Sequence, residues 1–243
     1  MVATYPAIYR DDQGEETTVI ENDGQTLRMV VRGVAFISRP FGSFDSFTPE
    51  AQEEASLAHF ALDSYRDLVA ATLVFEVPMP LVMGAKLVPS TLIVQVELES
   101  AGSLGTASRN WADPRMTLSV AGDQFASPGG WGSFEMELLR IQRQLPADSY
   151  MKCCFNCAFS GYNPAGNGLW GMFCHRSHKK EYVRANNKPP WFCLNAVSAE
   201  YVQEIYLCPE FQRWNGETGY RDGLFDNRLS AASGAPTKYA AKL

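Results

Sequence analysis

Up to about residue 130 the chain consists of short runs of β-branched and aromatic residues separated by Gly, Asp, Asn and Pro. The run from Ser90 to Ser100 alternates most clearly, with aliphatic residues at one set of positions and polar residues at the other: Leu92, Val94, Val96 and Leu98 against Gln95, Glu97 and Glu99. This period of two is typical of a half-buried antiparallel strand. Further strands are predicted at residues 17–21, 26–38, 68–80 and 115–127, and the Asp-Gly pair in "ENDGQT" predicts a hairpin between the first two. Strands at this spacing indicate an antiparallel β-sandwich or open barrel.

Two segments have a helical pattern. In residues 129–146, apolar residues form one stripe of an amphipathic helix, at Phe134, Leu138, Ile141 and Leu145. Ser133 can cap the start of this helix, Glu135 and Glu137 suit its positive N-terminal end, and Pro146 ends it. Residues 49–66 are ambiguous. Thr48 can cap a helix that has Pro49 in its first turn, and "LAHFALD" then alternates like a strand, so a short helix followed by a strand is favoured. The predicted class is therefore α+β, mainly β.

The composition and charge narrow the class of protein. The chain has 243 residues, 46% of them hydrophobic and 20% charged, which is ordinary for a globular protein, and its net charge of −6 opposes a whole-protein attraction to nucleic acid or anionic membrane. No window reaches the roughly 18 consecutive apolar residues of a membrane-spanning helix. The start, "MVATYPAIYRDDQGEE", lacks the basic and then apolar pattern of a secretory signal, so a cytoplasmic location is expected.

The chain changes in character near residue 130. We expect a β-rich domain at 1–130, a helix plus a zinc-binding module at 131–225, and a flexible tail at 226–243, where the sequence is small and polar.

The candidate chemistry lies in "MKCCFNCAFSGYNPAGNGLWGMFCHRSHKK", residues 151–180, which holds four of the six cysteines and two of the three histidines. In the cytoplasm thiols stay reduced, and clustered cysteines more often bind metal than form disulfides. Zinc takes four ligands in a tetrahedron, and the spacing of Cys154 and Cys157 brings two sulfurs to one point. The side chain of Cys153 should point elsewhere than that of its neighbour.

Two ligand sets would complete the site. In the local set, Cys154, Cys157 and Cys174 are joined by His175 or His178; in the distributed set, the fourth ligand is Cys208, which precedes a proline in "EIYLCPEF". Buried thiols or disulfides without metal are the other alternative, and Cys193 is interpreted as a buried structural thiol. Four thiolates leave no open coordination position, so such a zinc ion would stabilise the fold rather than activate water.

Several segments together resemble an uncharacterised bacterial family, a domain of unknown function with a β-rich N-terminal part and a C-terminal zinc-ribbon-like module. The similar segments are "YPAIYRDDQGEE", "FEVPMP", "FEMELLRIQRQLP", "MKCCFNCAFSGYNPAGNGLWGMFCHR" and "YVQEIYLCPEF", which span most of residues 5–220. The resemblance implies the distributed set, Cys154, Cys157, Cys174 and Cys208, around a structural Zn²⁺. His175 stands where an aromatic residue is more usual, which implies a local variation rather than a ligand. The resemblance implies no activity.

Known signatures of catalysis are missing from the sequence, which has no GxSxG, no HExxH and no phosphate-binding glycine loop. His59 is interpreted as a half-buried structural histidine, and Asp63 and Asp67 as surface turn residues. Residues 175–188 contrast with the acidic average, because they carry five cations, at Arg176, Lys179, Lys180, Arg184 and Lys188, and lie near several aromatic residues. Three interpretations of this segment are open: a solvated helix face, a binding site for nucleic-acid phosphates, or a binding site for an acidic protein partner.

The sequence therefore predicts a non-catalytic, zinc-stabilised protein that binds another protein, as an accessory, immunity-type or regulatory factor, without a membrane. The alternatives are a nucleic-acid-binding zinc protein that uses residues 175–188, and an unrecognised hydrolase.

Overall fold

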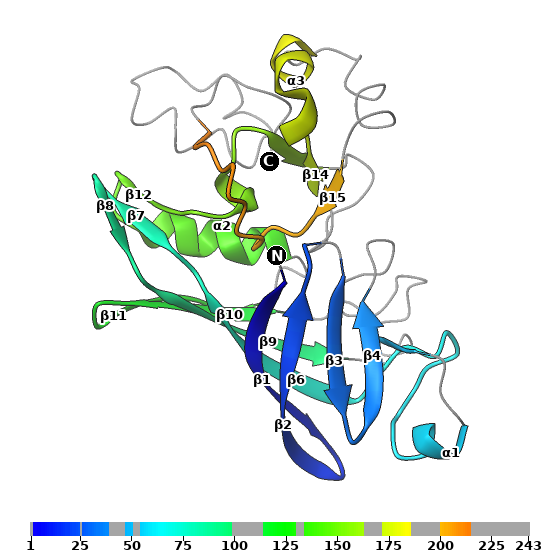
Figure 1. Ribbon diagram of the computed structural model, residues 1–243. Helices are drawn as coiled ribbons and strands as arrows, with labels where there is room; N and C mark the ends of the chain where they lie inside the picture. The colour runs from blue at the N-terminus through cyan, green and yellow to red at the C-terminus, as the bar shows by residue number, and fades with distance from the viewer. Residues whose placement is uncertain are drawn as a thin grey trace, which may run out of the picture.

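The computed structural model of the chain is shown in Figure 1, and it describes residues 2–24, 26–38, 47–50, 54–98, 114–129, 134–162, 172–185 and 200–214. Strands are the main element, and every strand pair in these residues is antiparallel. This confirms the mainly β class. The predicted tail at 226–243, Cys193 and Lys188 lie outside the described residues.

Nine strands form one sheet, in the order β11-β10-β9-β6-β1-β2-β3-β4-β5. Their bounds are β1 Ala3–Asp11, β2 Gly14–Asn22, β3 Leu27–Val31, β4 Val34–Ser38, β5 Thr48–Pro49, β6 Ala71–Pro78, β9 Thr91–Leu98, β10 Arg115–Val120 and β11 Asp123–Ser127. In Figure 1, β9 and β10 run across the view whereas β1 to β4 stand upright, so the sheet is strongly bent. Among the described residues this bent sheet ends at β11 and at β5, which is closer to an open barrel than to a two-layer sandwich.

The alternation of the strands places the core. In β9 the predicted inward residues, Leu92, Val94, Val96 and Leu98, are all buried. The strand β1, which was not predicted, buries Tyr5, Ala7 and Tyr9 on the same principle and pairs with β2 over its whole length.

Tight turns divide two of the predicted strands. Residues 26–38 form β3 and β4 around Arg32 and Gly33, whose φ angles of 48° and 78° are those of a two-residue hairpin turn of type I′. Ala121 and Gly122 divide residues 115–127 in the same way, with φ angles of 51° and 95°. The predicted hairpin between residues 17–21 and the following run is confirmed by the β2–β3 pairing, in which Asn22 lies opposite Leu27.

The helix start predicted at Thr48 and Pro49 is wrong. Both residues belong to β5, which pairs with β4, and the Thr48 hydroxyl donates to Asp67 (2.8 Å) instead of capping a helix. A short helix, α1, does follow at Glu54–Leu57, but the predicted strand after it amounts to one isolated bridge between Leu62 and Leu68. His59 is exposed rather than half-buried.

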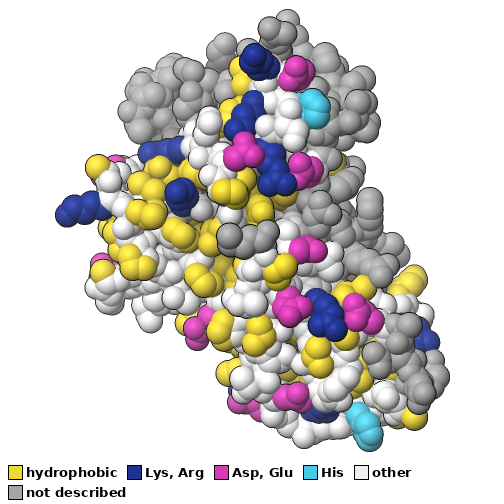
Figure 2. Space-filling view, in the orientation of Figure 1, with side chains coloured by type: hydrophobic (Ala, Val, Ile, Leu, Met, Phe, Trp, Pro, Cys, Tyr) yellow, Lys and Arg dark blue, Asp and Glu magenta, His cyan; other side chains and the backbone are white. Residues whose placement is uncertain are grey.

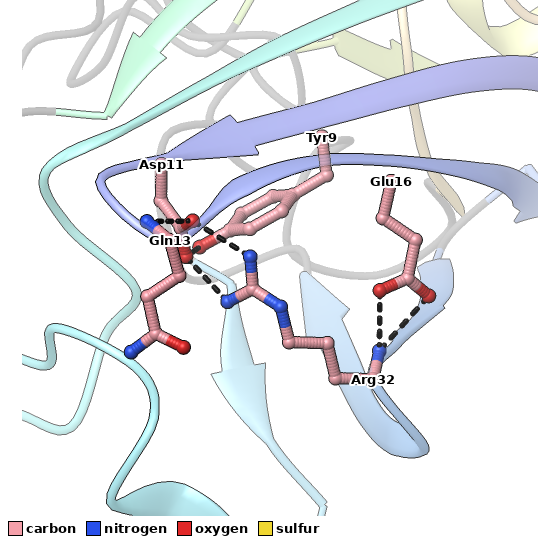
Figure 3. A network of polar contacts seen from close by, with 5 residues as sticks. All are labelled: Tyr9, Asp11, Gln13, Glu16 and Arg32. Carbon is pink, nitrogen blue, oxygen red and sulfur yellow. Dashed lines mark hydrogen bonds and ion pairs between the residues drawn. The ribbon is translucent and has the colours of Figure 1, made fainter.

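A polar network fastens the β1–β2 turn to the β3–β4 turn (Figure 3). The two terminal nitrogens of Arg32 donate to the two carboxylate oxygens of Asp11 at 2.6 and 2.7 Å, and Tyr9 donates its hydroxyl to the same carboxylate at 3.0 Å. The backbone N–H of Arg32 donates to the carboxylate of Glu16. Bonding to Arg32 is the main cause that lowers the pKa of Asp11 from 3.8 to about 2. The network therefore holds a strained turn, in which Arg32 has a positive φ, against the neighbouring hairpin.

A second sheet, β12-β7-β8, and the helix α2 cover one end of the large sheet (Figure 1). The strands are β7 Leu81–Met83, β8 Lys86–Val88 and β12 Ser149–Met151, and α2 spans Phe134–Gln144. The predicted helical stripe is confirmed, since Phe134, Leu138, Ile141 and Leu145 are all buried; the predicted cap, Ser133, lies outside the described residues. Gln144 donates to the carbonyl of Ala126 (2.8 Å), which fixes α2 along β11. No helix in the described ranges is long and apolar enough to cross a membrane.

Candidate metal centre

A third sheet, β13-β14-β15, supports the cysteines. Its strands are β13 Ser160–Tyr162, β14 Met172–Cys174 and β15 Glu200–Val202. A single 3₁₀ turn, η1 at Cys154–Asn156, precedes this sheet, and a second, η2 at Arg176–His178, leads into the helix α3 at Lys179–Ala185. Three described segments, 154–162, 172–185 and 200–202, therefore supply the elements of this module.

The Cys-Phe-Asn-Cys segment folds as a tight turn. The backbone N–H of Cys157 donates to the carbonyl of Cys154 at 3.0 Å, and the Ser160 hydroxyl donates to the carbonyls of both cysteines, at 2.5 and 3.1 Å. This buried serine was not identified from the sequence. It closes the turn from inside, so the spacing of two residues between the cysteines is fixed by hydrogen bonds as well as by chain length.

The segment that follows β15 holds the same turn from outside. The amides of Cys154 and Phe155 donate to the carbonyls of Tyr206 (3.0 Å) and Glu204 (2.9 Å). Further along, Ala158 donates to Gln212 at 2.7 Å. Cys208 stands between these contacts and opens a turn of its own, in which the N–H of Phe211 donates to its carbonyl at 3.2 Å. The chain thus returns to the first cysteine pair at Cys208.

Cys174 reaches the same place from β14. It is paired with Ser160 across the β13–β14 ladder, which brings it beside the turn that Ser160 closes. The thiols of Cys154, Cys157, Cys174 and Cys208 are all buried, with at most 7% of any of these residues exposed. The four cysteines of the distributed set therefore come from three segments that lie next to one another: the turn at 154–157, the strand β14 and the chain after β15.

The thiols influence each other electrostatically. Burial raises the pKa of the Cys154 thiol well above its usual value, and four neighbouring thiols, those of Cys174, Cys157, Cys153 and Cys208, raise it further. Burial also raises the pKa of Cys174, to about 11, although the backbone N–H of Arg176 donates to its sulfur and opposes the rise. A metal ion would replace the thiol protons, so binding at this place depends on pH and releases protons.

The donor set fits zinc in its chemistry. Buried thiols in a group of four are the ligands of closed structural zinc sites, and none of the five described cysteines is in a disulfide. In the part of the chain that the structure describes, no three Cys, His, Asp or Glu side chains already form a metal site. The sulfurs would therefore have to draw closer around an ion.

Cys153 is a fifth buried thiol beside the other four, and it interacts electrostatically with Cys154 and Cys157. It is completely buried, and burial raises the pKa of its thiol to about 12; its charged neighbour is Glu204. Glu204 is also completely buried, and neither of its carboxylate oxygens has a hydrogen-bond partner among the described residues. Burial is the main cause that raises the pKa of Glu204 well above its usual value, and the charge of Glu135 raises it further. No pattern in the sequence predicts this buried acid.

The two histidines of the local set lie next to the cysteines in the chain. The ring of His175 is buried and stacks on that of Tyr182, with the centroids 4.2 Å apart and an angle of 15° between the planes. Tyr182 donates its hydroxyl to the carbonyl of Ser160 at 3.1 Å. His175 thus takes part in an aromatic contact that joins α3 to β13. His178 is partly exposed.

The basic segment 175–188 is partly neutralised by its neighbours. Arg176 makes a two-pronged ion pair with Glu200, and Lys179 pairs with Glu210 at 3.0 Å while its ammonium lies 5.1 Å from the ring centre of Phe159. Lys180 is exposed; Arg184 belongs to α3, but its side chain lies outside the described residues.

Asp63, as expected for a turn residue, accepts hydrogen bonds from the backbone N–H groups of Tyr65 and Asp67.

A bent antiparallel sheet joined to a four-cysteine module defines the class of this protein. The model of a family of unknown function, DUF6304, matches residues 3–160, and because this is more than half of the chain, the protein belongs to that family. The match includes Cys154 and Cys157 and ends before Cys174 and Cys208. The comparisons with curated proteins and with solved structures gave no significant match.

Proposed function

We propose that the chain is a non-catalytic binding protein whose C-terminal module is held by a structural Zn²⁺ on Cys154, Cys157, Cys174 and Cys208. The observation that carries this proposal is that four buried thiols from three segments are neighbours, with each segment held by backbone hydrogen bonds or strand pairing. A zinc ion with four thiolates is closed to substrate and contributes folding free energy directly. A cytoplasmic setting and a bacterial source would suit such thiols.

The activity that we propose is binding to another protein. Cys153 does not have the properties of a nucleophile, because it is completely buried and the pKa of its thiol is raised, whereas a reactive cysteine needs exposure and a lowered pKa. The basic segment 175–188 offers less free charge to nucleic acid than its composition suggests, because Arg176 and Lys179 are paired with Glu200 and Glu210. These features favour a protein partner over an enzyme or a nucleic-acid-binding role.

Metal analysis of the full chain tests this proposal. We expect about one zinc per chain, with Cys208→Ser losing most of the metal and lowering the melting temperature. Cys153→Ser is the matched control, since it removes an equally buried neighbouring thiol and should keep the zinc. Equal zinc contents in the two variants, or no zinc in the parent protein, would overturn the proposed centre. Salt-dependent binding to RNA that is lost in Lys180→Glu would overturn the choice of partner.

A further inference from the structure

The small sheet β12-β7-β8 carries a row of apolar side chains on its outer face. In the register of the sheet, Tyr150 of β12 lies opposite Val82 of β7, and Val82 lies opposite Leu87 of β8. Directly paired residues project to the same face, so the three side chains form one row. The opposite face is the inner one, where Leu81 and Met151 are completely buried. In the outer row Tyr150 and Val82 are partly exposed, and Leu87 has 59% of its surface exposed.

Residues after Cys208 extend this row at its Tyr150 end. Phe211 stacks on Tyr150 with the ring centres 6.1 Å apart, and the guanidinium carbon of Arg213 lies 4.2 Å from the centre of the Tyr150 ring. Figure 2 shows the result as hydrophobic side chains gathered where Figure 1 draws β7, β8 and β12, with Lys and Arg side chains among them. Tyrosine and arginine are the residues that protein interfaces favour.

The outer edge of β8 is open for backbone pairing in the described sheet. Met83 and Lys86 close a two-residue turn in which Gly84 has a φ of 58°, so these two exchange both hydrogen bonds of the closing pair. The next pair, Val82 and Leu87, then exchanges none. The N–H and C=O of Leu87 therefore face away from β7, beside a side chain that is itself exposed.

The charges around the row are positive, in contrast to the chain as a whole. Lys86 precedes Leu87, Lys152 follows Tyr150 by two residues, and Arg213 lies on Tyr150. None of these three cations makes an ion pair within the described ranges. Asp148, which lies against the β7–β8 turn at Gly84, is the acid at this edge. Lys86 lies on β8 itself and projects to the face opposite Leu87, whereas Lys152 and Arg213 lie at the β12 end of the row. A strand that pairs with β8 therefore meets the apolar row on one face and Lys86 on the other.

We propose that β8 and the row formed by Tyr150, Val82 and Leu87 bind an extended, acidic segment of a partner protein, which adds to the sheet as a fourth strand. The backbone of the segment would pair with Leu87, its apolar side chains would continue the row on that face, and its carboxylates would meet Lys86 on the opposite face. A nucleic acid would not use the open N–H and C=O of the edge, and the row is aliphatic at Val82 and Leu87, where bases need aromatic rings. A second copy of the chain would bring its own Lys86 to the same edge.

This proposal rests on the proposed protein-binding function and names the partner's chemistry. The test begins with selection from a phage-displayed library of random peptides on the full-length, zinc-loaded protein. We expect selected sequences that alternate acidic with apolar residues. Their affinity, measured by fluorescence anisotropy, should fall about tenfold in Leu87→Ala, and further in Leu87→Pro, because only proline also removes the N–H that faces the open edge. Val183→Asp, at an exposed position of α3, is the control and should keep the parent affinity.

Two results would overturn the proposal. The first is the selection of peptides that lack acidic residues and bind Leu87→Ala with the same affinity as the parent protein. The second is an oligo(U) strand that competes with the selected peptides through the same residues. Zinc content and melting temperature show whether each variant is folded. If Leu87→Pro is not folded, the affinity of Leu87→Ala decides the test. The zinc measurement also separates the two proposals. A chain that holds zinc and selects no such peptide refutes the strand addition alone, whereas a chain without zinc refutes the metal centre while the peptide result still stands.

Discussion

Removing the carboxylate of Asp11 should destabilise the chain by about 2 kcal/mol at neutral pH. The pKa of Asp11 falls from 3.8 to about 2 on folding, and a difference of this size corresponds to about 2.5 kcal/mol at about 1.4 kcal/mol per pKa unit. Only 6% of the Asp11 side chain is exposed, but 23% of the Arg32 side chain is, so water screens part of the interaction. Tyr9 and Gln13 donate to different oxygens of Asp11, so Asn at position 11 keeps an oxygen for one of them and loses the charge that Arg32 needs. Asp11→Asn therefore removes the ion pair together with one of these two hydrogen bonds.

The pH dependence provides the sharper test. Because the folded pKa is the lower one, the stabilisation is fully present above about 3.8 and is lost as the pH falls toward about 2. Urea unfolding of parent and variant should give a difference near 2 kcal/mol at pH 7 and about half of that near pH 3. Arg10→Ala is the control, since Arg10 and Glu15 form a pair that is about half exposed and should contribute under about 0.5 kcal/mol. A difference that stays constant between pH 7 and pH 3 would refute the role assigned to the carboxylate charge.

Two further substitutions probe the junction between the large sheet and the cysteine module. Because burial raises the folded pKa of Glu204, the stability that its protonated form contributes is present below about 4.5 and is lost as the pH rises through the folded pKa. Glu204→Gln should remove this pH-dependent loss, so that stability to urea falls less steeply between pH 5.5 and 8 at constant zinc; an unchanged slope would contradict the prediction. Gly24→Ala places a Cβ 2.9 Å from the Tyr206 ring at a φ of 97° and should lower the free energy of unfolding by about 1 to 3 kcal/mol. The control is Gly33→Ala, where the φ is 78° and the space is open, and its loss of stability should be measurably smaller. Equal losses in the two variants would show that contact with Tyr206 is unimportant.

The strands with aliphatic alternation could be predicted from the sequence, and β1 could not. β9 buries Leu and Val at every second position, so its pattern is evident, whereas β1 buries Tyr5, Ala7 and Tyr9, which are less distinctive in composition. The helix α2 was predictable because its stripe is long and apolar. The start assigned at Thr48 was wrong because a Thr-Pro pair suits a short edge strand as well as a helix cap, and the pairing with β4 decides between them.

The candidate site shows a similar division. The spacing of Cys154 and Cys157 indicated a tight turn, and the turn is present, because a spacing of three residues is a local property of the chain. Ser160, Glu204 and the return of the chain to Cys208 depend on contacts between residues far apart in sequence. Single-sequence patterns contain no information on such contacts, so the buried acid and the serine that closes the turn had no signal to find.

The turn that carries the first two thiols depends on chain that follows the family match. The match ends at residue 160, yet the amides of Cys154, Phe155 and Ala158 donate to carbonyls between residues 204 and 212, and the amide of Trp214 donates back to Asn156 at 3.0 Å. Without those partners three buried amides would lose their acceptors, each at a cost of about 1 to 3 kcal/mol. The segment around Cys208 is therefore part of the structure that begins at Cys154. A metal held by both segments would stabilise a contact that the backbone already makes, and its loss should loosen β13, β14 and β15 before the nine-stranded sheet, in whose strands no cysteine lies.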